Sequence, residues 1–148
     1  MLLKDKVIII TGVGPGMGQA MAKIAAQEGA KVAIGARKKD YLDKVVAEIK
    51  AAGGEAIAVS TDVSKRDQCD ALVDATIKAF GRVDGLVNSA YAPGEMANFD
   101  AADVEGWKDS IDVSCLGAVR MAQAVAPHMK KQGGGAIVNV ATMQAQQH

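Results

Sequence analysis

Short apolar runs alternate with longer amphipathic stretches along this chain. The apolar runs span residues 6–10, 31–35, 56–60, 84–88 and 136–141, and polar and apolar positions alternate little within them. Runs of this kind are typical of strands that are buried on both faces of a sheet. The stretches between them, residues 16–29, 39–52, 65–80 and 102–131, are compatible with helices that have one apolar face. The alternation predicts a parallel sheet whose strands are joined by right-handed helical crossovers.

The length and the element boundaries refine this picture. The 148 residues suit a single domain, 1–148, with a real hydrophobic core. The predicted architecture is a doubly wound α/β fold with three layers, α/β/α. Ser64 immediately precedes the third predicted helix, and Asp67 stands three residues after Ser64. This spacing predicts an N-cap at Ser64 with a capping-box acid at Asp67.

Composition and charge exclude several classes of function. Charged residues make up 23% of the chain and its formal net charge is zero, so we expect a small ligand rather than nucleic acid. Cys69 and Cys115 lack the spacing of a disulfide framework or a metal site. The N-terminal apolar run is too short to span a membrane and has no cleavage site, which favours a cytoplasmic protein.

A glycine-rich segment joins the first predicted strand to the first predicted helix. It reads TGVGPGMG at positions 11–18. Glycines allow a tight turn, a close approach of the backbone to a pyrophosphate and close packing of the helix on the sheet, while free N–H groups at the helix start attract the anion. Such a turn can also be only a turn, but the strand before it and the helix after it match a Rossmann-like dinucleotide site. We therefore predict dinucleotide binding.

Basic residues follow the second predicted strand, where an NAD-binding site usually has an acid that bonds the ribose hydroxyls. Here the residues are Arg37, Lys38 and Lys39. A guanidinium can bind a 2′-phosphate through paired hydrogen bonds. Alternatively, Lys38 and Lys39 only begin a solvated helix, which we favour for Lys39. We expect NADP(H) to be preferred over NAD(H), with Arg37 as the main phosphate ligand.

Four further segments complete a resemblance to the short-chain dehydrogenase/reductase family. The glycine spacing TGxxxGxG is that of the family, and Asp62 and Val63 follow the third strand as its adenine-binding pair does. Residues 88–91 (NSAY) resemble its NNAG motif, and residues 111–117 (IDVSCLG) resemble a helix segment that normally ends VNxxG. Residues 135–142 (GAIVNVAT) resemble its fifth strand, which usually ends in a catalytic Ser. These motifs are in the family's order and cover nearly the whole chain.

The resemblance implies roles for these residues. Thr142 stands where the Ser orients the reacting oxygen, and Ser114 stands where an Asn holds a proton-relay water; a shorter hydroxyl could still hold one. Tyr91 replaces the Gly of NNAG, and either contacts substrate or only packs in its loop. No metal ligands are implied. The cofactor-binding residues indicated by the glycine turn, the basic segment and the resemblance are Gly12, Pro15, Gly16, Met17, Gly18, Arg37, Lys38, Asp62, Val63, Asn88, Ser89 and Ala90.

The implied function is hydride transfer between NADP(H) and a small-molecule carbonyl or secondary alcohol, by a homodimer or homotetramer. The family's catalytic Tyr and Lys, in the pattern YxxxK, are expected at about position 155, beyond the end of this sequence. The domain is therefore expected to be incomplete at its C-terminus. Its sheet would have the order 3-2-1-4-5 and be truncated after the fifth strand, with an uncovered edge. The alternatives are a dinucleotide-binding module without catalysis, or an inactive fragment.

Overall fold

A central parallel sheet carries the fold of the computed structural model, which describes residues 1–94 and 97–141. Its strands lie in the order β3-β2-β1-β4-β5, as predicted. The strands are β1 (Val7–Thr11), β2 (Lys31–Ala36), β3 (Glu55–Ser60), β4 (Gly85–Asn88) and β5 (Ala136–Asn139). The helices are α1 (Met17–Gln27), α2 (Lys39–Ala51), α3 (Arg66–Phe80), α4 (Val104–Ile111) and α5 (Gly117–Lys131), with a π-helical turn, η1 (Asp112–Leu116), between the last two.

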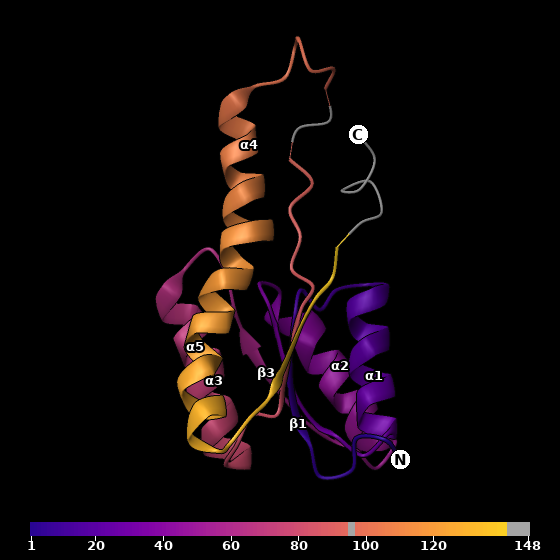
Figure 1. The fold of residues 1–148 in the computed structure, drawn as a ribbon. Coiled ribbons are helices and arrows are strands. Elements are labelled where there is room, and N and C mark those ends of the chain that lie inside the picture. The colour runs from indigo at the N-terminus through magenta and orange to yellow at the C-terminus, as the bar shows by residue number, and fades with distance from the viewer. Residues whose placement is uncertain (95–96, 142–148) are drawn as a thin grey trace.

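Helices cover both faces of the sheet, which gives the predicted three layers. Helices α1 and α2 lie on one face, and α3 and α5 on the other (Figure 1). On the α3 and α5 face, Ile9 and Leu86 of the sheet pack with Leu72 and Met121 of the helices. The opposite core contains Ile10 and Ile34 of the sheet with Ala22 of α1 and Leu42, Val45 and Ile49 of α2. These last three residues, spaced three and four apart, form the apolar stripe that the pattern of the chain predicts for α2.

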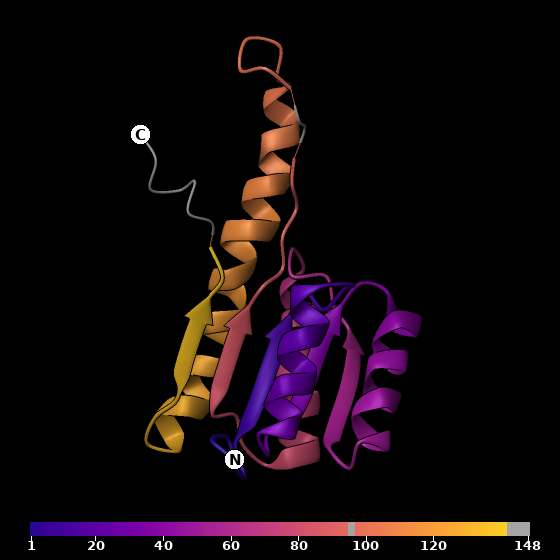
Figure 2. The ribbon, with the colours of Figure 1, turned by 90° about the vertical axis from the view of Figure 1, so that its right-hand side faces the viewer.

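The fifth strand is more exposed than its sequence predicts. Every residue of β5 is exposed, although its apolar composition predicts burial on both faces. Val138 is paired with Val87 of β4, so it lies on the α1 and α2 face of the sheet. Those helices cover β1, β2 and β3 and do not extend over β5 (Figure 2). The prediction of a buried strand is therefore wrong for β5, while the predicted open edge is present among the described residues.

The last long helical stretch, predicted over 102–131, is helical from residue 104 to residue 131 and contains a wide turn. Helix α4 has no buried residue and extends beyond the carboxyl ends of the strands (Figures 1 and 2). In η1 the N–H of Gly117 bonds the carbonyl of Asp112, which is the five-residue spacing of a π-helix. The π-helical turn therefore rotates α4 relative to α5 and changes the direction in which the side chains of α4 point.

The capping prediction at Ser64 is wrong. Helix α3 begins at Arg66, its N-cap is the extended Lys65, and no side chain caps it. The N–H of Ser64 instead donates to Oδ1 of Asp62, 2.9 Å away. This local turn keeps Ser64 outside the helix because it uses the Ser64 N–H before the helix starts.

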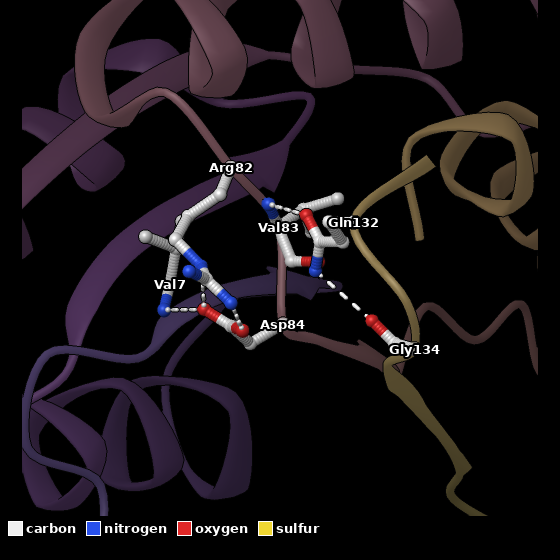
Figure 3. Close-up of polar contacts among 6 residues, drawn as sticks. All are labelled: Val7, Arg82, Val83, Asp84, Gln132 and Gly134. Carbon is white, nitrogen blue, oxygen red and sulfur yellow. Dashed lines mark hydrogen bonds and ion pairs between the residues drawn. The ribbon is translucent and has the colours of Figure 1, made fainter. Parts of the chain in front are cut away.

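Two polar side chains connect the segments at the amino ends of the strands (Figure 3). Asp84, just before β4, accepts hydrogen bonds from the N–H of Val7 at 2.9 Å and from Arg82 at 2.6 and 2.9 Å. Gln132, after α5, donates to the carbonyls of Val83 at 2.7 Å and Gly134 at 3.0 Å. The turns at this end are thereby fixed, and the opposite, carboxyl end of the sheet is left for the candidate site.

Candidate functional site

A cleft of about 1000 Å³ opens at the carboxyl ends of the strands. The sheet order reverses here, because β2 and β3 lie on one side of β1 and β4 and β5 on the other. Ligands of open α/β sheets bind at such a reversal. The cleft is lined by residues 12–15, 36–38, 41, 61–65, 89–92, 109, 112 and 113.

The glycine turn forms one wall through very close backbone contacts. A Cβ atom on Gly12 would lie 2.3 Å from the carbonyl oxygen of Ser89, and Gly12 has a φ of 71°. A Cβ on Gly18 would lie 2.6 Å from the carbonyl oxygen of Gly12, so α1 begins directly against the turn. Only glycine fits either place without a backbone shift. The sequence anticipates these close approaches.

The predicted pyrophosphate-binding residues divide into two groups. Gly12 and Pro15 line the cleft. Gly16 is the N-cap of α1 and forms no side-chain cap, while Met17 and Gly18 begin the helix and do not line the cleft. The N–H groups of this first turn are the anion-binding groups that the glycine motif predicts, and their role stays a prediction.

Thr11 holds the two central loops together. Its buried hydroxyl accepts a hydrogen bond from the N–H of Ser89 at 3.3 Å and donates to the carbonyl of Val87 at 3.4 Å. In the sequence, Thr11 is noticeable only as the first letter of the glycine motif. Its position at the end of a buried strand is the signal that could have indicated this bridging role.

The basic pair after β2 lies at the cleft, as expected. Arg37 and Lys38 both line it, and the Arg37 carbonyl accepts a hydrogen bond from the Ser60 hydroxyl at 3.2 Å. Tyr41 also lines the cleft, and its hydroxyl donates to Oε1 of Gln19 on α1 at 2.7 Å. The sequence does not predict this contact, although Tyr41 is only four residues after Arg37 and lies in the first turn of α2.

Asp62 and Val63 lie opposite the glycine turn and line the cleft. The N–H of Asp62 donates to Oε1 of Gln68 at 2.8 Å, which orients the turn after β3. Hydrogen bonding by Ser64 lowers the pKa of the Asp62 carboxyl, and the nearby Arg37 charge lowers it further, although partial burial opposes both. Asp62 is therefore a carboxylate at neutral pH and can accept hydrogen bonds from a ligand.

The segment after β4 forms the other wall. Ser89, Ala90 and Tyr91 line the cleft, and Tyr91 is 72% exposed. Asn88 is buried outside the cleft; its Nδ2 donates to Oδ1 of Asn139 at 2.9 Å and to the carbonyl of Ala118 at 3.4 Å. Asn88 thus joins β4 to β5 and α5. It would affect cofactor binding only indirectly, by positioning the loop of residues 89–92. That part stays a prediction.

The two predicted catalytic hydroxyls are placed differently. Ser114 is in η1, where its hydroxyl accepts a hydrogen bond from the N–H of Ala92 at 3.1 Å and donates to the Ala92 carbonyl at 3.4 Å. It therefore anchors the Tyr91 loop and does not itself line the cleft. Thr142 lies outside the described residues. The catalytic roles of both stay predictions.

One wall of the cleft is formed by helical residues that the sequence does not predict to lie there. Asp109, Asp112 and Val113 reach it from the end of α4 and the start of η1. Helical periodicity could not place them, because the wide turn shifts the face of the helix. Within residues 1–94 and 97–141 there is no cluster of three or more His, Cys, Asp or Glu residues suited to a metal, and no helix is long and apolar enough to cross a membrane.

Comparison with known proteins agrees with the glycine turn, the strand order and the cleft. The short chain dehydrogenase family model matches residues 6–148. The chain belongs to this family. A short-chain dehydrogenase/reductase structure from Burkholderia xenovorans superposes with a TM-score of 0.90 at 34% identity, covering 99% of this chain and 60% of that one.

Two curated relatives of this chain carry the name uncharacterized oxidoreductase. One from Listeria innocua is 39% identical over 140 residues, covering 93% of this chain and 55% of the relative. One from Staphylococcus saprophyticus is 35% identical over 143 residues, covering 95% of this chain and 56% of the relative. The chain thus spans little more than half the length of these relatives. Family membership implies a nicotinamide dinucleotide cofactor and leaves the choice between NAD(H) and NADP(H) open.

Proposed function

We propose that this protein is the cofactor-binding part of an oxidoreductase that transfers a hydride between NADP(H) and a carbonyl or secondary alcohol. The observation that carries the proposal is the placement of Arg37 and Lys38 in the same cleft as the glycine turn. The segment between β2 and α2 contains no carboxylate that would repel a 2′-phosphate. A guanidinium there favours NADP(H) through paired, charge-assisted hydrogen bonds.

The described residues fit such a cofactor. The cleft volume of about 1000 Å³ is at the upper end of the range for ligand sites, as an extended dinucleotide needs. Gly12 keeps the turn free of side-chain atoms and the start of α1 offers backbone N–H groups to the pyrophosphate. Arg37 would bind the 2′-phosphate, Asp62 the adenine amino group, and Val63 the adenine face. Ser89 and Ala90 would line the path toward the nicotinamide.

A bound cofactor would give or accept the hydride, and the chain's own residues would orient the reacting groups. Thr142 would hydrogen-bond the substrate oxygen, and Ser114 would hold a water for proton transfer. Tyr91, exposed at the cleft, would contact substrate or shape its entry. The family's proton donor, a Tyr with a following Lys, is proposed for a longer chain, because residues 1–148 contain no YxxxK.

A second candidate is a dinucleotide-binding module without catalysis. The observation that favours it is the engagement of the Ser114 hydroxyl by both backbone groups of Ala92, which leaves it less capacity to hold a water. NADPH oxidation with a panel of ketones and aldehydes distinguishes the two. Turnover by the full-length protein supports the oxidoreductase, whereas tight binding with no turnover supports the module.

The cofactor preference is tested by titrating NADPH and NADH against the protein and its Arg37→Gln variant. We expect the wild type to bind NADPH more tightly. The variant should lose about 10- to 100-fold in NADPH affinity, because a charge-assisted pair contributes about 1.5–3 kcal/mol, while NADH affinity changes less than about threefold. Arg66→Gln is the control, because Arg66 pairs with Asp70 away from the cleft. Equal losses for both cofactors would contradict the assignment of Arg37.

The predicted cytoplasmic location and oligomer belong to the same proposal. Support for a homodimer or homotetramer comes from large apolar side chains exposed along the last helices, namely Val104, Ile111, Leu116 and Val119. Large apolar side chains exposed on neighbouring elements are common at protein–protein interfaces. Light scattering coupled to size exclusion measures the oligomer, and a monomer at all concentrations would contradict it.

A further inference from the structure

Arg120 of α5 connects two parts of the cleft without lining it. Its Nη1 donates to the carbonyl of Val63 at 3.3 Å and to the carbonyl of Asp112 at 3.1 Å. Its Nη2 lies 2.5 Å from Oδ1 of Asp112. The Arg120 side chain is only 23% exposed, so these contacts are partly shielded from water. One guanidinium thus joins the turn after β3 to the start of η1.

The wide turn creates the acceptor that Arg120 uses. In a regular α-helix the Asp112 carbonyl would accept from residue 116, but here it accepts from the N–H of Gly117. Arg120 adds a second hydrogen bond to this oxygen and an ion pair to the same residue's carboxylate. Asp112 and Val113 both line the cleft. Arg120 therefore stabilises the helical register that presents them there.

Val63 is held on the same side by close packing. A Cβ on Gly117 would lie 2.6 Å from Cγ2 of Val63, so the start of α5 touches this residue directly. The side chain of Val63 is buried, and its carbonyl also lies 3.6 Å from the Cys69 sulfur. Arg120 supplies the charge-assisted hydrogen bond in this set, and the same guanidinium joins the turn of residues 62–64 to Asp112 of η1.

We propose that Arg120 is a positioning residue that sets the affinity for the nucleotide end of the cofactor. It does so by holding the Asp62–Val63 turn against η1, so the adenine-side wall and the wall formed by Asp112 and Val113 keep one relative position. The inference rests on the proposed dinucleotide function. Without the Arg120 contacts, the turn of residues 62–64 would have to become ordered when the cofactor binds. The entropy lost in that ordering lowers the affinity.

The test compares Arg120→Met and Arg120→Lys with the wild type in the full-length protein. The probes are NADPH and adenosine 2′,5′-bisphosphate, which represents the nucleotide end alone. Arg120→Met should raise the Kd of both probes by the same factor, about 5- to 20-fold, since it removes three charge-assisted contacts. Arg120→Lys should recover part of this loss. An ammonium group can still form an ion pair with the Asp112 carboxylate, but it cannot donate to the Val63 and Asp112 carbonyls with the geometry of a guanidinium.

Arg66→Met is the matched control. Arg66 also forms an ion pair, with Asp70, and its Nη1 donates to Gln123 of α5 at 3.0 Å, yet it does not line the cleft or contact Val63. It should leave both Kd values unchanged. Circular dichroism and thermal unfolding verify that each variant is folded at the titration temperature.

The outcomes separate the two proposals. Binding of both probes by the wild type with unchanged Kd values in Arg120→Met overturns the role of Arg120 and leaves the proposed function intact. Failure of the wild type to bind either probe overturns both. An equal loss in Arg120→Lys and Arg120→Met, or a loss in Arg66→Met of the same size, overturns the positioning role, because the effect then follows general destabilisation. Parallel losses for the two probes with partial recovery in Arg120→Lys support it.

Discussion

At the scale of single residues, the shape of the cleft depends on glycines that have no side chain. Gly12 and Gly14 are two residues apart in the same turn, yet a Cβ on Gly12 would meet the backbone of Ser89, while a Cβ on Gly14 would meet nothing within 4 Å. Gly12 also has a positive φ, and Gly14 does not. The two glycines therefore have different physical reasons for being glycine.

Gly12→Ala and Gly14→Ala should differ in the unliganded protein. We expect Gly12→Ala to lower the free energy of unfolding by about 1–3 kcal/mol, because the strained φ and the clash with Ser89 both oppose the native backbone. Gly14→Ala should change it by less than about 0.5 kcal/mol. Urea denaturation without ligand measures both values. A loss of NADPH affinity in Gly14→Ala without any loss of stability would indicate that the ligand itself needs the space above Gly14.

At the scale of elements, the strand pairing is reinforced by a carboxylate at the amino end of the sheet. Asp84 bridges the first residue of β1 and Arg82, and its side chain is 12% exposed (Figure 3). Burial acts to raise the pKa of the Asp84 carboxyl, but hydrogen bonds from Arg82 and from the Val7 N–H outweigh it and leave this pKa below its ordinary value. The ionised form therefore stabilises the junction of β1 and β4.

Asp84→Asn should lower the free energy of unfolding by about 1–3 kcal/mol at neutral pH. Because the folded pKa is depressed, the stabilising contribution is fully present above the unfolded pKa of about 3.9 and is lost as the pH falls through the folded value. The difference between wild type and variant should thus shrink below about pH 4. Urea titrations from pH 3 to 7 measure it, with Asp70→Asn, an exposed helical pair, as a control that changes stability by less than about 0.5 kcal/mol. A pH-independent difference would contradict the linkage.

The elements also mark the limit of what the sequence predicts. The five strands and their order follow from apolar runs and family motifs, because buried parallel strands carry a strong local signal. The wide turn η1 does not, since a one-residue change in helical hydrogen bonding leaves no trace in periodicity. The error at Ser64 has a similar cause: Asp62 competes for the same N–H, and two local polar motifs overlap there.

The site itself is only partly predictable for the same reason. The glycine turn, Arg37 and Asp62 lie at strand ends, where topology alone brings them together. Asp109 and Asp112 reach the cleft from a helix, and Arg120 acts from outside it, so their positions depend on the tertiary packing of α5. Asn88 matches a family motif, yet its amide is used between β4 and β5.

At the scale of the whole molecule, the two edges of the sheet are unlike. β3 is covered by α2 and α3, whereas Ile137 and Val138 of β5 are 40% and 54% exposed on opposite faces. An apolar edge strand is a template for pairing with another chain. Besides the apolar side chains of α4, η1 and α5 that support the proposed oligomer, the exposed β5 is therefore a second surface through which we expect the 148-residue chain to self-associate.

Val138→Lys should slow that self-association at least about threefold, because a charge on an edge strand disfavours edge-to-edge pairing. Val138 is exposed, so the folded core is not altered. Ile24→Lys, at an equally exposed position of α1, is the control and should have little effect. Static light scattering of the 148-residue chain at 37 °C follows the rate. Equal slowing by both substitutions would attribute the effect to net charge rather than to β5.

The contact between Val7 and Asp84 has a consequence for how the protein is made. The two residues are 77 positions apart, so at a translation rate of about 5–20 residues per second the ribosome takes about 4–15 s to supply the partner of β1 after β1 itself. During that interval β1, β2 and β3 can pair with one another, but one side of β1 has no strand beside it. We therefore expect the nascent chain to depend most on chaperones between the synthesis of β3 and that of β4.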